Sequence, residues 1–203
     1  MQSARQIYPV KARSDNWMYL VVDEASKEGA VVDPYDWKKM LDVVKEKGVN
    51  LANHPQGSSI KAYAGSYSPG TNTIVKDKSS FELAGGNIKG GCGRFFEGTA
   101  EEMHAALSYL SKLPQDTIVY NGHEYTSGSA KFGQSVEPDN KDISRLQELV
   151  KNGDGCSAGK STIADELTWN VFMRLGQPAI QKATGETDPV KVMGKLREMK
   201  NAA

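Results

Sequence analysis

A histidine lies just beyond a short apolar run in the stretch TIVYNGHEYTSG, residues 117–128. The run Thr117–Tyr120 is rich in β-branched residues, which predicts a buried strand. His123 follows it beside a glycine and Glu124, and imidazole is the commonest metal ligand among protein side chains. His123 is therefore a candidate metal ligand, and the alternative is a structural histidine that bonds a backbone carbonyl.

The chain has only three histidines. His54 precedes Pro55 at a predicted strand end, so it is either a ligand or a turn residue. His104 lies within a predicted helix and is expected to be solvated. At best, His54 and a carboxylate could join His123 in a weak single-metal site.

Two glycine-rich segments could also do chemistry. In GGCGRFFEG, residues 90–98, the cation Arg94 lies beside two phenylalanines, and the alternative is a tight turn that leads into a helix. In GDGCSAGKST, residues 153–162, the glycine spacing does not match a phosphate-binding loop, and a helix rather than a strand precedes it. We interpret this second segment as a loop.

Composition excludes several partner classes. The 25 basic and 25 acidic residues balance, which argues against nucleic acid or an anionic membrane as the main partner. No apolar run has the length of a signal peptide or a membrane span, and two cysteines cannot form a disulfide framework. We expect a soluble, cytoplasmic monomer.

The elements that must position these residues change from strands to helices along the chain. The expected strands are Ile7–Val10, Trp17–Asp23, Gly29–Asp33 and Val49–Leu51, with shorter pieces at Ile60–Ala64, Thr73–Lys76 and Phe81–Leu83. The expected helices are Trp37–Lys47, Thr99–Leu110, Asp142–Val150 and Asp188–Lys200. Thr99 and Glu102 form a predicted capping box, and Asp188 followed by Pro189 is a typical helix start.

Six fragments carry a family resemblance, in this order: DNWMYLVVD, AVVDP, GGCGRFFEGTAEEM, VYNGHEYT, VEPDN and ETDPVKVMGKLREMK. Together they resemble glyoxalase II, the hydroxyacylglutathione hydrolase branch of the metallo-β-lactamase superfamily. The resemblance covers residues 6–51 and 90–200 well and residues 60–89 loosely. It implies an α/β (α+β) fold: a truncated metallo-β-lactamase-like αβ/βα sandwich over residues 1–126, then a C-terminal helical, glutathione-binding region over residues 127–203.

The resemblance also implies a reaction. The family's site holds two metal ions, commonly zinc, and a metal-bound hydroxide attacks the thioester of S-D-lactoylglutathione. The products are D-lactate and glutathione, and the pathway is methylglyoxal detoxification. A metal ion suits this chemistry because it lowers the pKa of bound water towards about 7 and polarises the carbonyl.

Individual residues match the family's pattern. His123 matches a metal ligand. Four residues match groups that bind the glutathione part of the substrate: Arg94, Tyr125, Arg197 and Lys200. Phe96 stands where some members have a tyrosine, so we expect one hydrogen bond fewer there.

The chain departs from the family where most of the metal ligands should lie. The signature T-H-x-H-x-D-H should follow the strand near Val49, where the chain reads VNLANHPQGSSIKAY. A histidine within P-x-H-T and an aspartate within G-D-T-L-F should precede GGCGRFF, but Lys89 is joined directly to Gly90. The family's two-metal site needs five histidines, so three cannot assemble it. We expect zinc binding to be lost and hydrolysis to be impaired.

Three hypotheses of function follow from these observations. The first is a glyoxalase II that hydrolyses S-D-lactoylglutathione. The second is a binder of glutathione conjugates without catalysis, because the glutathione-site residues are present while the metal signatures are absent. The third is the product of a splice variant or a faulty gene model with no function of its own.

Overall fold

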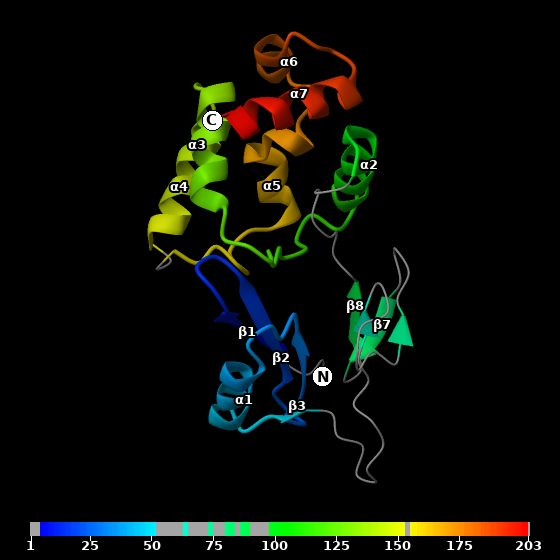
Figure 1. Ribbon diagram of the computed structural model, residues 1–203, viewed down its shortest axis with the longest axis vertical. Coiled ribbons are helices and arrows are strands. Elements are labelled where there is room, and N and C mark those ends of the chain that lie inside the picture. The colour runs from blue at the N-terminus through cyan, green and yellow to red at the C-terminus, as the bar shows by residue number, and fades with distance from the viewer. Residues whose placement is uncertain are drawn as a thin grey trace. The chain divides into compact units, whose positions relative to one another are not determined.

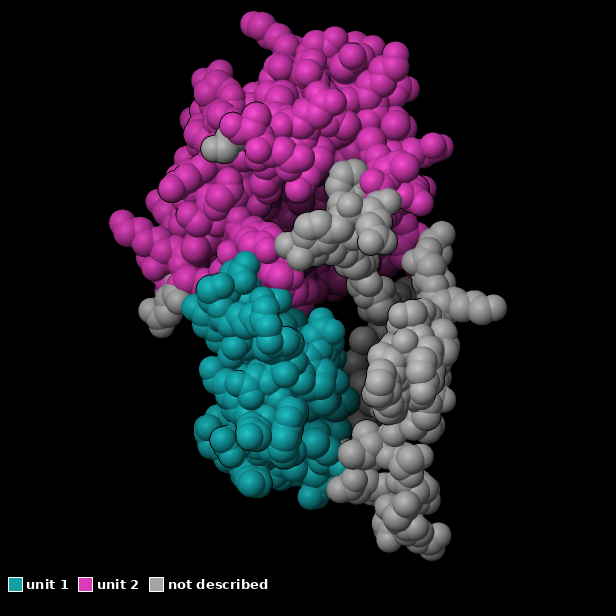
Figure 2. All heavy atoms as spheres, viewed as in Figure 1, with its two compact units in different colours: residues 1–92 teal, residues 93–203 magenta. Residues whose placement is uncertain are grey.

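The chain divides into two compact units, residues 1–92 and residues 93–203 (Figure 2). The computed structural model describes residues 5–51, 98–152 and 155–202, together with the backbone of four short strands between them. The family-based domain boundary at residue 126 lies later in the chain than the division between the compact units, and it stays a prediction.

Unit 1 is built on a four-stranded sheet in the order β1-β2-β3-β4 (Figure 1). The strands are β1 (Arg5–Lys11), β2 (Trp17–Asp23), β3 (Glu28–Val32) and β4 (Asn50–Leu51). β1 pairs antiparallel with β2, β2 antiparallel with β3, and β3 parallel with β4. Four shorter strands follow: β5 (Tyr63–Ala64), β6 (Thr73–Ile74), β7 (Ser80–Leu83) and β8 (Gly86–Lys89).

One helix covers one face of this sheet. α1 (Trp37–Glu46) begins where the Asp36 side chain accepts a hydrogen bond from the Lys39 backbone N–H. The buried residues of α1 and the alternating residues of β2 belong to one apolar cluster, because successive side chains on a strand point to opposite faces. Its buried members are Val10, Met18, Leu20, Val22, Met40, Val44 and Val49.

The described part of unit 2 is mainly helical. Its helices are α2 (Ala100–Leu110), α3 (Thr126–Val136), α4 (Lys141–Asn152), α5 (Ile163–Trp169), the 3₁₀ turn η1 (Val171–Met173), α6 (Pro178–Thr184) and α7 (Pro189–Ala202). α3 packs side by side with α4, and α7 packs against α2 and α6 (Figure 1). None of the described helices is long and apolar enough to cross a membrane.

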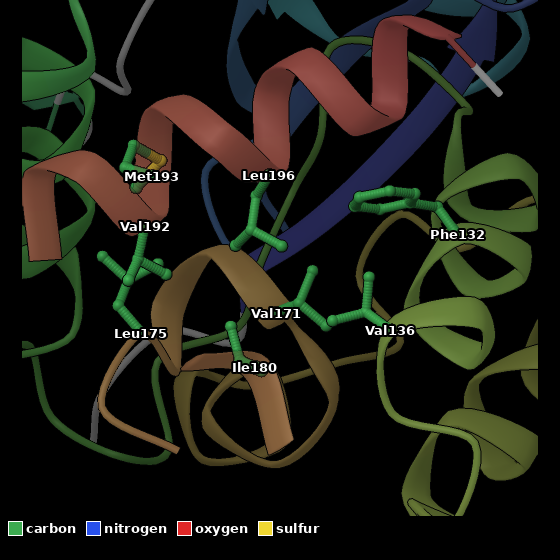
Figure 3. Close-up of a cluster of buried hydrophobic side chains, with 8 residues drawn as sticks. All are labelled: Phe132, Val136, Val171, Leu175, Ile180, Val192, Met193 and Leu196. Atoms are coloured by element: carbon green, nitrogen blue, oxygen red, sulfur yellow. The ribbon is translucent and has the colours of Figure 1, made fainter. Parts of the chain in front are cut away.

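Two apolar clusters hold the helices of unit 2 together. The first, called here the α7 cluster, consists of Phe132, Val136, Val171, Leu175, Ile180, Val192, Met193 and Leu196 (Figure 3). Leu196 points from α7 towards Val171, and Phe132 lies on the neighbouring α3. The second, called here the α4 cluster, consists of Ala130, Ile143, Leu146 and Trp169, with Leu149 packed against it.

The fold class predicted from the sequence is confirmed: a mixed α/β unit that is consistent with a truncated metallo-β-lactamase-like fold is followed by a C-terminal helical region. The four main strands and four helices expected from the sequence are present, with ends that differ by a few residues at most. The capping box of Thr99 and Glu102 is formed. Residues 155–162 form a loop, as interpreted from the glycine spacing.

The buried strand predicted over Thr117–Tyr120 is wrong. Among the described residues this segment makes one isolated bridge, between Ile118 and Thr162, and the Ile118 side chain is 51% exposed. β-branched composition predicts a strand only where neighbouring strands continue the hydrogen-bonded ladder. Within the described ranges the segment pairs with the loop before α5 and with the first residue of that helix, so it stays extended and half exposed.

Candidate functional site

Unit 2 contains a cavity of about 340 Å³, and four of the residues singled out in the sequence line it. They are His123, Tyr125, Arg197 and Lys200. Packing therefore brings the GHEYT stretch and the last helix, which are far apart in the sequence, to one site. Two other candidates, Arg94 and His54, lie outside the described residues, and His104 is half-buried on α2 without lining this cavity.

Backbone hydrogen bonds to a neighbouring loop fix the segment that precedes His123. The Val119 N–H donates to the Ser161 carbonyl at 2.9 Å, and the Gly159 N–H donates to the Val119 carbonyl at 2.9 Å. Gly159 has a φ of +76°, and a Cβ built on it would lie 2.8 Å from Cε1 of Tyr120. This position requires glycine, because any larger residue would strain the backbone and collide with the ring.

Glu124 ties the same loop to the GHEYT stretch through its side chain. One carboxylate oxygen accepts the Ser157 backbone N–H at 2.6 Å, and the other accepts the Ser157 hydroxyl at 2.9 Å. The Ser157 hydroxyl also lies 2.8 Å from that of Thr126, and the buried Ser157 lines the cavity. Sequence reasoning gave Glu124 no role, although its place between two candidate residues is a signal in the sequence.

His123 and Tyr125 line the same cavity as Ser157, the partner of Glu124. Their rings stack with centroids 4.9 Å apart and planes 19° apart. The Asn121 side-chain amide donates to the His123 carbonyl at 2.5 Å. Tyr125 is 48% exposed and His123 is half-buried, so the tyrosine is the more accessible of the two rings.

The last helix supplies the positive charge of the cavity. Lys200 donates from Nζ to the Ser129 hydroxyl at 2.8 Å, and Nζ lies 6.0 Å and 5.7 Å from the ring centroids of Phe132 and Phe172. Burial lowers the pKa of Lys200, and the positive charge of Arg197 lowers it further. Within the described ranges Lys200 forms no ion pair, so an anionic ligand would supply the missing counter-charge.

The acidic residue on the cavity wall is bonded to uncharged donors. Glu166 accepts hydrogen bonds from the Trp169 indole N–H at 3.1 Å and from the Asn170 side-chain amide at 3.0 Å. The Ser161 hydroxyl adds a third contact at 3.2 Å. Three neutral groups thus donate hydrogen bonds to the Glu166 carboxylate, as expected of a partly buried polar group.

The described residues do not fit the family's two-metal centre. In the parts of the chain that the structure describes, no group of three or more histidine, cysteine, aspartate or glutamate side chains could hold a metal ion. Glu124, the acidic residue next to His123 in the chain, is bonded to Ser157. The single-metal alternative involves His54, which lies outside the described residues, and stays a prediction.

Comparisons with known proteins point to one family. Residues 124–203 match the family described as "Hydroxyacylglutathione hydrolase C-terminus". A probable hydroxyacylglutathione hydrolase of Schizosaccharomyces pombe is 32% identical, with 97% of each chain covered. A hydroxyacylglutathione hydrolase of Synechococcus sp. is also 32% identical, over 97% of this chain and 99% of the relative.

The alignment with the Schizosaccharomyces pombe protein also contains positions that this chain lacks. It runs over 251 positions, whereas the chain has 203 residues, so at least 48 positions (251 less 203) face no residue of this chain. Because 97% of both proteins is aligned, most of these gaps are internal. The placement of the missing segments near residues 51 and 89 stays a prediction. The extent and level of these matches show that the chain belongs to the hydroxyacylglutathione hydrolase (glyoxalase II) family.

Proposed function

We propose that this chain binds the glutathione part of glutathione thioesters in the cavity of unit 2, and that its hydrolysis of S-D-lactoylglutathione is impaired. The single observation that carries the proposal is a contrast between two sets of residues. Tyr125, Arg197 and Lys200 line one cavity, whereas the described residues contain no cluster of metal ligands.

The binding half of the proposal rests on charge and size. Glutathione carries two carboxylates, and a carboxylate that accepts hydrogen bonds from a charged donor forms a shorter and stronger contact than a neutral pair. Arg197 and Lys200 are three residues apart on α7 and therefore lie on the same side of the helix. The cavity of about 340 Å³ falls within the range of small-molecule sites, and the hydroxyl of Tyr125 adds a neutral donor.

The second half of the proposal, impaired hydrolysis, rests on the metal ligands. Hydrolysis in this family relies on metal-activated water, and a metal site requires several ligands at fixed positions. Among the described residues, His123 lines the cavity without two further ligating side chains grouped around it. The internal gaps in the alignment support this half, because at least 48 aligned positions face no residue of this chain.

A calorimetric titration of the full chain with glutathione tests the binding half. We expect measurable binding at millimolar glutathione. Lys200→Met keeps the side chain's apolar length but removes its charge, and it should weaken binding by about tenfold or more, the effect of losing a hydrogen bond to a charged group. Lys195→Met is the matched control, because Lys195 lies on the same helix, pairs with Glu198 and does not line the cavity.

Two results would contradict the proposal. One is an absence of binding to the unmodified chain at millimolar glutathione. The other is an equal loss of affinity in Lys195→Met and Lys200→Met, which would indicate a general effect of charge on α7 rather than a contact in the cavity.

A further inference from the structure

We propose that the cavity of unit 2 selects glutathione conjugates whose sulfur carries an apolar substituent over those that carry the small, polar lactoyl group. This inference rests on the proposed function, since it assumes that the glutathione part binds at the same site. It names a class of substituent that differs from the hydroxyacyl group in the family name.

The walls of the cavity connect the two apolar clusters of unit 2. Leu107, Phe172 and Met193 line it from the α7 cluster and the side chains packed on that cluster. Leu146, Leu149 and Trp169 line it from the α4 cluster. The cavity is therefore bounded by apolar side chains from both clusters, and a ligand that fills it would replace water along these walls.

The charged groups that bind an anion come from a single helix. Lys200 and Arg197 both belong to α7, and Lys200 lies over the ring of Phe172, which itself lines the cavity. The α4 wall contributes Leu146 and Leu149, which carry no polar atoms. This distribution suits an elongated molecule with a carboxylate at one end and an apolar group elsewhere.

The lactoyl group matches the α4 wall poorly, because the side chains of Leu146 and Leu149 offer it no hydrogen-bond partner. Its hydroxyl would need a hydrogen-bond partner once water is excluded, and a buried polar group without one is unfavourable. An alkyl or aryl substituent has no such requirement. Each methylene group that is buried fully strengthens binding about fourfold.

The test compares three probes with the full chain by calorimetry: glutathione, S-methylglutathione and S-hexylglutathione. The hexyl group has five more methylenes than the methyl group, and even partial burial should make S-hexylglutathione bind at least about tenfold more tightly than S-methylglutathione. Equal affinities of these two conjugates would overturn the inference, whether or not any variant folds.

A pair of variants on α4 locates the effect. Leu149→Gln places an amide on the cavity wall and should reduce the ratio of the two affinities to about threefold or less. Val150→Gln is the control, because Val150 is the next residue on the same helix, is also half-buried and does not line the cavity. An unchanged ratio in Leu149→Gln, with native helical dichroism, would place the hexyl group elsewhere and overturn the inference.

The same titrations separate this inference from the proposed function. If glutathione and S-methylglutathione bind and S-hexylglutathione binds no better, the glutathione site stands and the apolar selection fails. If none of the probes binds, both fail. If S-hexylglutathione binds equally well to Lys200→Met, the conjugate does not use the carboxylate contact on α7, and both proposals are overturned.

Discussion

Replacing Glu124 by alanine should destabilise unit 2 by about 2–4 kcal/mol. The variant removes the acceptor of the Ser157 backbone N–H, a contact of 2.6 Å to a charged group that contributes about 1.5–3 kcal/mol. It also removes an acceptor of the Ser157 hydroxyl, which keeps Thr126 as a partner, so that this second loss is about 0.5–1.5 kcal/mol. Water cannot fully replace the lost acceptor, because Ser157 is only 7% exposed.

Urea unfolding followed by helical circular dichroism measures this effect, because most of the described helices belong to unit 2. Glu124→Gln keeps one acceptor oxygen and should lose about half as much stability. Glu148→Ala, at an exposed position on α4, should change the free energy of unfolding by less than about 0.5 kcal/mol. A Glu124→Ala protein as stable as the unmodified chain, or a Gln variant as unstable as the Ala variant, would refute the reasoning.

Four further predictions concern the same unit. Gly159→Ala should destabilise unit 2 by at least about 1–2 kcal/mol in the same unfolding experiment, because of its positive φ and the Tyr120 ring, whereas Gly128→Ala in α3 should be neutral or stabilising. Arg174→Met should lower the free energy of unfolding by about 3 kcal/mol, because it leaves the buried Glu137 carboxylate without its ion-pair partner. An unchanged urea midpoint would contradict this, because it would show that the hydrogen bond from Asn140 is enough to stabilise the carboxylate. Burial lowers the pKa of Lys200, so its positive charge is lost at a lower pH than that of an ordinary lysine. Calorimetry should therefore show the affinity for S-methylglutathione falling as pH rises through that lowered pKa. This fall should be absent in Lys200→Met. With no ligand, the unfolded chain holds the Lys200 proton more tightly, so the free energy of unfolding should rise with pH between the two pKa values.

Local signals in the sequence were sufficient for elements with clear caps or periodicity. Thr99 begins a helix as predicted, α1 starts at the predicted Trp37, and β2 has the predicted bounds, Trp17–Asp23. α6 was missed although Pro178 at its start and Gly185 at its end are ordinary signals. α3 could not be found in this way, because no side chain caps its first turn and it contains two glycines.

The grouping of the candidate residues in one cavity depends on tertiary packing, which local sequence patterns do not predict. The spacing of Arg197 and Lys200 predicts one helix face, but their placement in a cavity with Tyr125 follows from the packing of α7 through its apolar side chains. The contact between Glu124 and Ser157 joins residues 33 positions apart, through a loop whose sequence alone indicated only a turn. His123 was a candidate from its residue type and position, whereas Tyr125, Arg197 and Lys200 came from the family resemblance. The structure shows that these four residues line one cavity.

The most direct test of the central claim is the turnover of S-D-lactoylglutathione by the purified full chain, with and without added zinc, at a concentration at which glutathione binding is measured. We predict binding without zinc-dependent thioester loss above the rate in buffer. Zinc-dependent turnover that disappears in His123→Ala would contradict the account, because it would mean that a working metal site is completed by residues beyond those described.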